Sequence, residues 1–164
     1  MKLKNILVSF TIAFIFWILL NNTLVPMILG TGALLSLGIS LIFCSRCDVF
    51  SELKLTPAAF LYTFIYIIVF LYELIKSNLD VARRVITPAL PIKPGIVEVK
   101  TRLRSKMGRM ILANSITLTP GTLTIDMVED TLYIHWIDVK TENIEEATEK
   151  IVRKFEKYLE KIYG

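Results

Sequence analysis

The pattern of apolar and polar residues divides the chain into two halves of different character. Three long apolar runs occupy the first half, at residues 3–20, 24–43 and 58–76, and the second of them contains no charged residue. A helix of about 20 residues spans the roughly 30 Å hydrocarbon core of a bilayer. We therefore predict that residues 1–76 form about three transmembrane helices. A cleaved signal peptide is not expected, because the first run is too long and no small-residue cleavage site follows it.

The second apolar run carries small residues at a spacing of four. Gly32, Ser36 and Ser40 fall on one face of a helix at this spacing. Small residues let the backbone of another helix approach closely, so the stripe predicts a helix-packing seam. A lipid-facing stripe without a role in packing is the alternative, and the sequence leaves it open.

An amphipathic segment and a proline-rich linker follow the third run. Leu79, Ala82 and Ile86 have helical spacing and predict a helical continuation at the membrane interface. Three prolines, spaced three residues apart from Pro88 onward, favour a stiff, extended chain. We interpret residues 77–95 as a basic juxtamembrane helix and a linker.

Residues 96–164 combine strand and helix patterns. Val97 and Val99 alternate with charged residues, which predicts a half-buried strand. Ser105 is a suitable N-cap for a helix that runs to about Leu118, where a Thr-Pro-Gly sequence ends it.

Two further strands and a last helix complete the polar half. Alternating residues at 122–127 and 132–137, joined through Glu129 and Asp130, predict a β-hairpin. Apolar residues at helical spacing from about 141 to 162 predict one covering helix. The predicted fold is thus a membrane α-helical N-terminal half plus a small cytoplasmic α+β domain in β-α-β-β-α order.

Composition and charge add a membrane orientation to this picture. The 164 residues are 54% hydrophobic and carry a net charge of +4, but residues 76–109 alone hold nine Lys or Arg against two acidic residues. Basic residues next to a span favour the cytoplasmic side, so we expect a multi-pass plasma-membrane protein with a cytoplasmic C-terminal domain. Three full spans would then place Lys2 and Lys4 outside. A first hairpin that enters the membrane without crossing it would instead keep both ends inside, and the sequence does not decide between these topologies.

The basic segment also bears on possible partners. Lys and Arg beside a membrane attract anionic lipid headgroups, so membrane lipids are expected partners. Nucleic acid is not expected, because the aromatic residues of this half are not interleaved with the basic ones. The absence of glutamine and the abundance of Lys, Glu and Ile favour a thermophilic source.

Few residues offer chemistry. Cys44 and Cys47 have the spacing of half a metal site, but no second pair exists in the sequence, so no metal is expected. Glu73 is a possible intramembrane carboxylate, with pairing to Lys76 favoured over a role in ion or proton passage. His135 is the only histidine, and a packed or interface position is favoured over proton transfer. We therefore predict no catalytic residues and no cofactor.

Two sequence blocks resemble a known family. The run Asn114-Ser-Ile-Thr-Leu-Thr-Pro-Gly-Thr122 and the run Leu132-Tyr-Ile-His-Trp-Ile-Asp138 resemble the E subunit of the Mrp-type multisubunit cation/proton antiporters, also called Mnh or Pha. Related modules occur in archaeal membrane-bound hydrogenases and sulfur-reducing complexes. The positions that match the signature are Asn114, Ser115, Thr117, Thr119, Pro120, Gly121, Thr122, His135 and Asp138.

The resemblance implies an accessory and assembly subunit of a sodium/proton antiporter, or of the ion-translocating module of a hydrogenase or sulfur-reducing complex. Its partners would be the other subunits, and the matched positions would form an interface without catalytic roles. A stand-alone, membrane-anchored module that binds lipid or another ligand is the alternative. A membrane enzyme is the least favoured interpretation, because no nucleophile, base or metal set is evident in the sequence.

Overall fold

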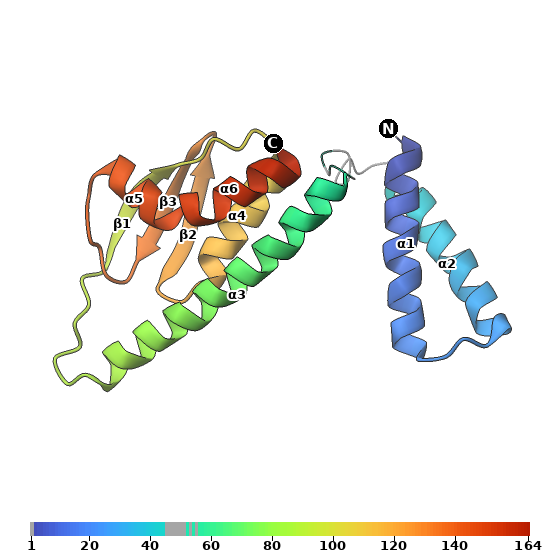
Figure 1. Ribbon diagram of the computed structural model, residues 1–164, viewed down its shortest axis with the longest axis horizontal. Helices are drawn as coiled ribbons and strands as arrows, with labels where there is room; N and C mark the ends of the chain where they lie inside the picture. The colour runs from blue at the N-terminus through green and yellow to red at the C-terminus, as the bar shows by residue number, and fades with distance from the viewer. Residues whose placement is uncertain (1, 45–51, 53, 55) are drawn as a thin grey trace. The chain divides into compact units, whose positions relative to one another are not determined.

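The computed structural model describes residues 2–44, 52, 54 and 56–164 (Figure 1). Contacts divide the chain into two compact units, Met1–Leu53 and Lys54–Gly164. The first unit is a helical hairpin. The second joins a long helix to a small sheet with its covering helices.

The first unit consists of α1 (Lys2–Asn21) and α2 (Pro26–Cys44), which pack against each other. Each is long and apolar enough to cross a membrane. Gly32 lies directly against the ring of Trp17, and the indole Nε1 of Trp17 donates a hydrogen bond of 3.0 Å to the carbonyl oxygen of Ile28. Ser36 and Ser40 are buried one and two turns further along α2. The stripe of small residues therefore faces α1.

The second unit begins with α3 (Pro57–Ile86), a single helix of 30 residues. Thr56 caps its start and Pro57 occupies the first turn, where a missing N–H costs nothing. The predicted third span and the predicted amphipathic continuation are therefore one unbroken helix, which ends at Ile86 with Thr87 as its C-cap. By length and composition α3 is also a candidate span.

A three-stranded antiparallel sheet follows, in the order β1-β3-β2. Its strands are β1 (Gly95–Lys100), β2 (Thr122–Val128) and β3 (Thr131–Trp136). Its helices are α4 (Lys106–Leu118), α5 (Ile144–Ile151) and α6 (Arg153–Tyr163). The predicted α+β fold and its element order are confirmed.

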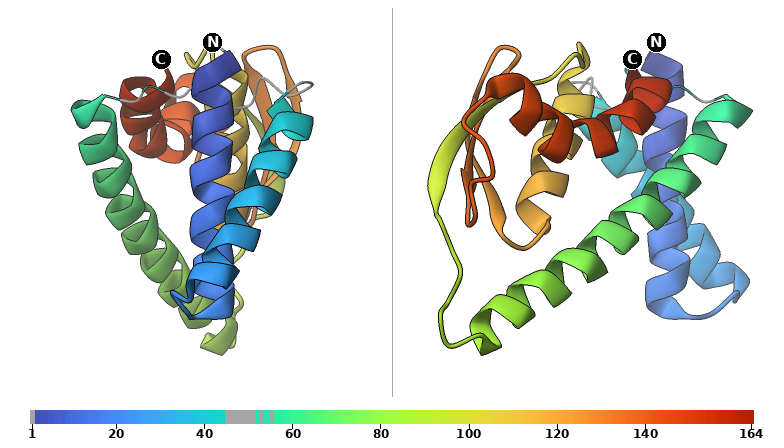
Figure 2. Two further views of the ribbon diagram at one scale, coloured as in Figure 1. Left: turned by 90° about the vertical axis from the view of Figure 1, so that its right-hand side faces the viewer. Right: turned by 60° about the vertical axis from the view of Figure 1, so that its left-hand side comes forward.

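The helices cover one face of the sheet, as the right-hand view of Figure 2 shows. The core between them contains these buried side chains: Val97, Val99, Leu112, Ile116, Leu132, Ile134, Phe155 and Leu159. The other face is open: Ile96 is 64% exposed and Leu123 is 49% exposed. A β-bulge between Thr124 and Asp126 shifts the register of β2, so that Met127 pairs with Leu132 beyond it.

The last helix differs from the prediction. We expected one helix over about 141–162, whereas the structure has two segments separated at Val152. Each segment contacts a different neighbour: α5 packs on β1, and α6 packs on α3 and α4. Because of the break, α5 and α6 run in different directions, and the apolar residues of each segment pack on a different surface.

Candidate functional site

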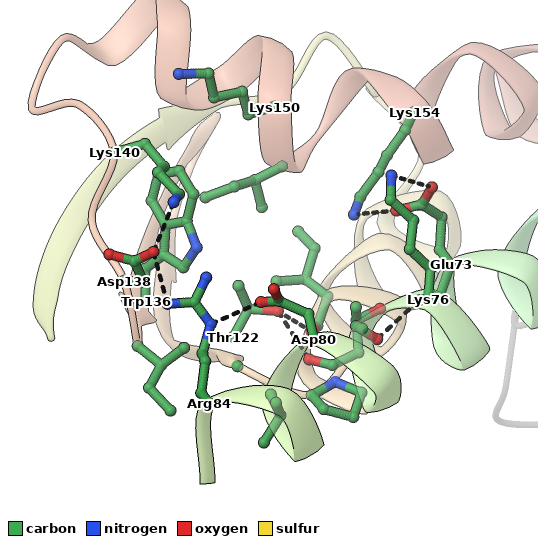
Figure 3. A pocket seen from close by; sticks show the side chains of 18 of the residues that line it. Glu73, Lys76, Asp80, Arg84, Thr122, Trp136, Asp138, Lys140, Lys150 and Lys154 are labelled. Atoms are coloured by element: carbon green, nitrogen blue, oxygen red, sulfur yellow. Dashed lines mark hydrogen bonds and ion pairs between the residues drawn. The ribbon is translucent and has the colours of Figure 1, made fainter. Parts of the chain in front are cut away.

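A pocket of about 560 Å³, lined by apolar and charged side chains, lies between α3 and the sheet domain (Figure 3). Its walls come from α3, from the turn between α4 and β2, from the end of β3 and from the α5–α6 region. Six residues singled out from the sequence line it: Glu73, Thr119, Pro120, Gly121, Thr122 and Asp138. The structure thus brings together the Thr-Pro-Gly-Thr turn, the aspartate of the second signature block and the α3 carboxylate.

Asp138 and Arg84 join the two sides of this pocket. The guanidinium Nη1 of Arg84 lies 2.8 Å from Oδ2 of Asp138, and its Nε lies 2.7 Å from Oδ2 of Asp80, one turn earlier on α3. Arg84 also donates a 2.6 Å hydrogen bond to the carbonyl oxygen of Pro91 in the linker. One arginine therefore ties α3, the linker and the end of the sheet to each other.

Lys140 completes the surroundings of Asp138, with its Nζ 2.7 Å from the same Oδ2. The hydrogen bond from Lys140 is the largest influence on the pKa of Asp138 and lowers it. Partial desolvation raises that pKa, and the hydrogen bond and charge of Arg84 lower it again, so that the pKa lies below the ordinary value of an aspartate. Asp138 is therefore an ionised anchor for two cations at neutral pH.

Glu73 forms a second link between α3 and the domain. Its Oε2 accepts a 2.8 Å hydrogen bond from Nζ of Lys154 on α6, while Nζ of Lys76 is 3.7 Å from Oε1. The Glu73 side chain is 16% exposed. The expected pairing with Lys76 exists, but the shorter contact is to a lysine 81 positions away, which no local pattern could indicate.

The hydroxyl groups of the first signature block stabilise a helix end. Thr119 donates from Oγ1 to the carbonyl oxygen of Ser115 at 2.7 Å, and Thr122 donates to that of Ile116 at 2.7 Å. Ser115 itself contacts the hydroxyl of Tyr66 on α3. Gly121 has a φ of +91°, which favours glycine at the turn into β2. These residues satisfy the last carbonyls of α4 and hold the turn in place.

The remaining signature residues lie outside the pocket. Thr117 accepts a 3.2 Å hydrogen bond from the backbone N–H of Thr124, and Asn114 is exposed on α4. His135 is half-buried on the central strand, paired with Ile96 on one side and Leu123 on the other. Cross-strand partners share a face, so His135 belongs to the open face of the sheet.

Charged residues of the pocket form ion pairs between α3 and the sheet domain. The pocket contains cations that the sequence had not singled out as site residues, chiefly Arg84, Lys150 and Lys154. One sequence signal could have pointed to Arg84: its spacing from Asp80 suits an i,i+4 ion pair on a helix. Among the described residues, no three metal-ligating side chains gather at one place. Cys47 lies outside the described residues, and the side chain of Cys44 is likewise not described.

Comparison with known proteins places these features in a family. The model of the Na+/H+ ion antiporter subunit family MNHE matches residues 10–162, which covers both units of the chain. The chain belongs to this family. The E1 subunits of Na+/H+ antiporters from Staphylococcus haemolyticus and Staphylococcus epidermidis are 34% and 35% identical, and each alignment covers 92% of the chain. The same alignments cover 96% and 93% of the length of these two relatives, respectively.

A solved structure is also similar over nearly the whole chain. It is a chain of the membrane-bound sulfane sulfur reductase, an archaeal respiratory membrane complex, with 46% sequence identity and a TM-score of 0.84. The match covers 94% of this chain and 96% of that one. Membership in the MNHE family and the long apolar helices identify a membrane protein.

Proposed function

We propose that the chain is an accessory and assembly subunit of a multisubunit membrane complex of the antiporter or respiratory type, and that it does no chemistry alone. The observation that carries this proposal is the 46% identical match to a chain of a respiratory membrane complex, which includes both the helical hairpin and the sheet domain. A chain whose whole architecture recurs inside an assembly is built to work there.

The same comparison supports one type of parent complex over the other. The sulfane sulfur reductase chain is 46% identical over 94% of the chain, whereas the staphylococcal antiporter subunits are 34% and 35% identical over 92%. This difference favours a respiratory complex with a cation/proton-exchanging module. A sodium/proton antiporter is the second candidate, supported by the family match.

The ion pairs of the pocket support a mechanical role. The charged side chains of the pocket, apart from Lys150, form ion pairs, and these hold α3, the linker and the sheet domain together. The arrangement fixes the geometry of a bracing domain, and it places no nucleophile beside a base among the described residues lining the pocket. We place this domain in the cytoplasm, because of the nine basic residues at 76–109.

The open face of the sheet is the surface that we assign to a neighbouring subunit. Ile96, His135 and Leu123 form one row across the three strands, and the two aliphatic residues are largely exposed. An exposed apolar row on a sheet is typical of a protein interface. The signature histidine would then serve recognition between subunits.

Deletion of the gene for this chain tests the proposal. The parent complex should then fail to migrate intact on a native gel, and its ion exchange or respiratory activity should fall together with assembly. Wild-type chain supplied in trans should restore both. A complex that assembles and works fully without the chain would contradict the proposal and favour the alternative, a stand-alone module that binds lipid or another ligand.

A further inference from the structure

The sheet domain contacts α3 along nearly its whole length. Just before its first turn, the backbone N–H of Lys54 donates to the carbonyl oxygen of Ile162, at 3.4 Å. In the middle, Phe70 packs against Phe155 with ring centroids 6.3 Å apart, and near the end Arg84 pairs with Asp138. A helix of this length extends about 45 Å, at about 1.5 Å per residue. Figure 1 shows α3 running beneath the domain from one end to the other.

The most apolar half of α3 is the half that carries a highly charged helix. α6 runs from Lys154, which pairs with Glu73, to its C-terminal end beside Lys54. Six of its 11 residues are charged: Arg153, Lys154, Glu156, Lys157, Glu160 and Lys161. If α3 crossed the bilayer, α6 would lie within the hydrocarbon layer beside it. Charged side chains are excluded from the hydrocarbon core, so a crossing that carries this helix into the core is strongly disfavoured.

The opposite face of α3 is apolar and uncovered by the domain. Its large side chains recur at helical spacing and are between 48% and 66% exposed: Leu61, Phe64, Ile68, Leu71, Ile75 and Leu79. Lys76 and Arg83, both exposed, lie along one border of this stripe. An apolar face bordered by basic residues is the pattern of a helix that lies in the membrane interface.

We propose that α3 lies along the membrane–water interface, with its apolar face in the lipid and its other face holding the domain, and that it does not cross the bilayer. The occupant of the apolar face is lipid, for two reasons. The face follows directly on a membrane hairpin, since α2 ends at Cys44 and α3 begins at Pro57. Lys76 and Arg83 complement anionic headgroups at the depth where an interfacial helix lies.

The distribution of charge supports the same topology independently. Two crossings, by α1 and α2, return the chain to the side from which it started. Lys2, Lys4 and the basic residues of 76–109 then share one side of the membrane, while the connection between α1 and α2, residues 22–25, carries no charge. Three crossings would separate the two basic groups. The positive-inside tendency thus favours two spans, in place of the three predicted from apolar length.

Single cysteines at the two ends of α3 test this topology in native membranes. In a background with Cys44→Ser and Cys47→Ser, Ala58→Cys and Ala89→Cys place thiols at exposed positions. A membrane-impermeant maleimide should label both from the same side. Leu24→Cys, in the exposed connection between α1 and α2, is the matched control and should be labelled only from the other side. Labelling of Ala58→Cys and Ala89→Cys from opposite sides would overturn the proposal.

Spin labels along the apolar face test the occupant. Phe64→Cys, Leu71→Cys and Leu79→Cys are all exposed positions on this face. We expect nearly equal immersion depth at the three sites, measured as the ratio of collision rates with oxygen and with a water-soluble nickel complex. A depth that changes steadily along the helix would indicate a crossing. Low accessibility to both reagents would show that protein covers the face, and either result would overturn the proposal.

The interfacial position of α3 does not depend on the identity of the parent complex. Failure of the deletion experiment would leave this position unaffected, and opposite-side labelling would leave the subunit role unaffected. The two conclusions therefore stand or fall on different measurements.

Discussion

Glu156 shows how a single buried charge holds the domain together. It is 1% exposed, and its Oε1 accepts hydrogen bonds from Oγ1 of Thr101 at 2.5 Å and from the backbone N–H of Arg102 at 2.6 Å. The guanidinium of Arg153 binds its other oxygen. Thr101 and Arg102 directly follow β1, and Arg153 is the first residue of α6. Glu156 therefore connects the segment after the first strand to the last helix.

Replacement of Glu156 by glutamine should destabilise the protein by about 3 kcal/mol, because the buried carboxylate loses its charge, which weakens its contact with Arg153 and two charge-assisted hydrogen bonds together. The free energy of unfolding of the detergent-solubilised chain measures this. Glu149→Gln, an identical change at an exposed position, is the control and should alter stability by less than about 0.5 kcal/mol. Equal effects of the two changes would show that the network contributes nothing.

Asp138 gives a pH-dependent prediction. Its pKa is lower in the folded state than its ordinary value, so its contribution to stability is complete above the ordinary aspartate range and is lost as the pH falls through the folded pKa. Asp138→Asn should cost about 1 kcal/mol at pH 7, and the difference from wild type should shrink as the pH falls below the ordinary aspartate range. Denaturant unfolding at pH 7 and in acid checks this.

The exposed change Glu142→Gln is the control for that series, since Glu142 is an exposed residue before α5. It should leave stability within about 0.5 kcal/mol at either pH. A deficit of Asp138→Asn that is the same at pH 7 and in acid would mean that the carboxylate charge does not matter and that only the shape of the side chain is needed.

At the residue scale, the sequence indicated only one partner of each of the two ion pairs that join α3 to the domain. Asp138 and Glu73 were candidates from the start, one through a family signature and one as a carboxylate in an apolar run. Their partners Arg84 and Lys154 come from other elements, 54 and 81 positions away. Charge pairs of this kind depend on how helices pack on the sheet, which local sequence patterns do not contain.

At the scale of elements, the contact between α1 and α2 depends on one glycine. A side chain at Gly32 would collide with the ring of Trp17, whereas Gly38 has open space around it. Gly32→Ala should therefore push the two helices apart and lower the thermal midpoint of the solubilised protein or of its complex. Gly38→Ala is a matched control on the same helix and should be neutral or slightly stabilising, because alanine favours helix. Equal midpoints for the two variants would contradict close packing at Gly32.

Most elements could be predicted from the sequence, because their signals are local. Ser105 as a cap, the turn at Gly121 and the alternation of Val97 and Val99 each specify a short segment without help from the rest of the chain. The break at Val152 could not be predicted, since α5 and α6 separate only because they pack on different partners. The bulge in β2 likewise depends on pairing with β3.

At the scale of the whole molecule, α3 has the composition of a transmembrane helix, but its packing against the domain indicates a different position. Its length and apolarity satisfy the criteria for a span, and the sequence pattern alone predicts one. The domain that covers its other face carries charges that a bilayer core excludes. The membrane role of a helix is therefore decided by what packs on it as well as by its own residues. In the topology that we propose, two helices anchor the chain and a third lays the bracing domain along the membrane surface.

The central claim is that this chain works as part of a larger complex. Purification of the tagged chain from native membranes in a mild detergent tests this claim most directly. We predict co-elution with several other membrane proteins in fixed ratio, and the identity of these partners would distinguish a respiratory complex from an antiporter. A monodisperse preparation of the chain alone, with lipid-dependent binding of a ligand, would contradict the proposed role.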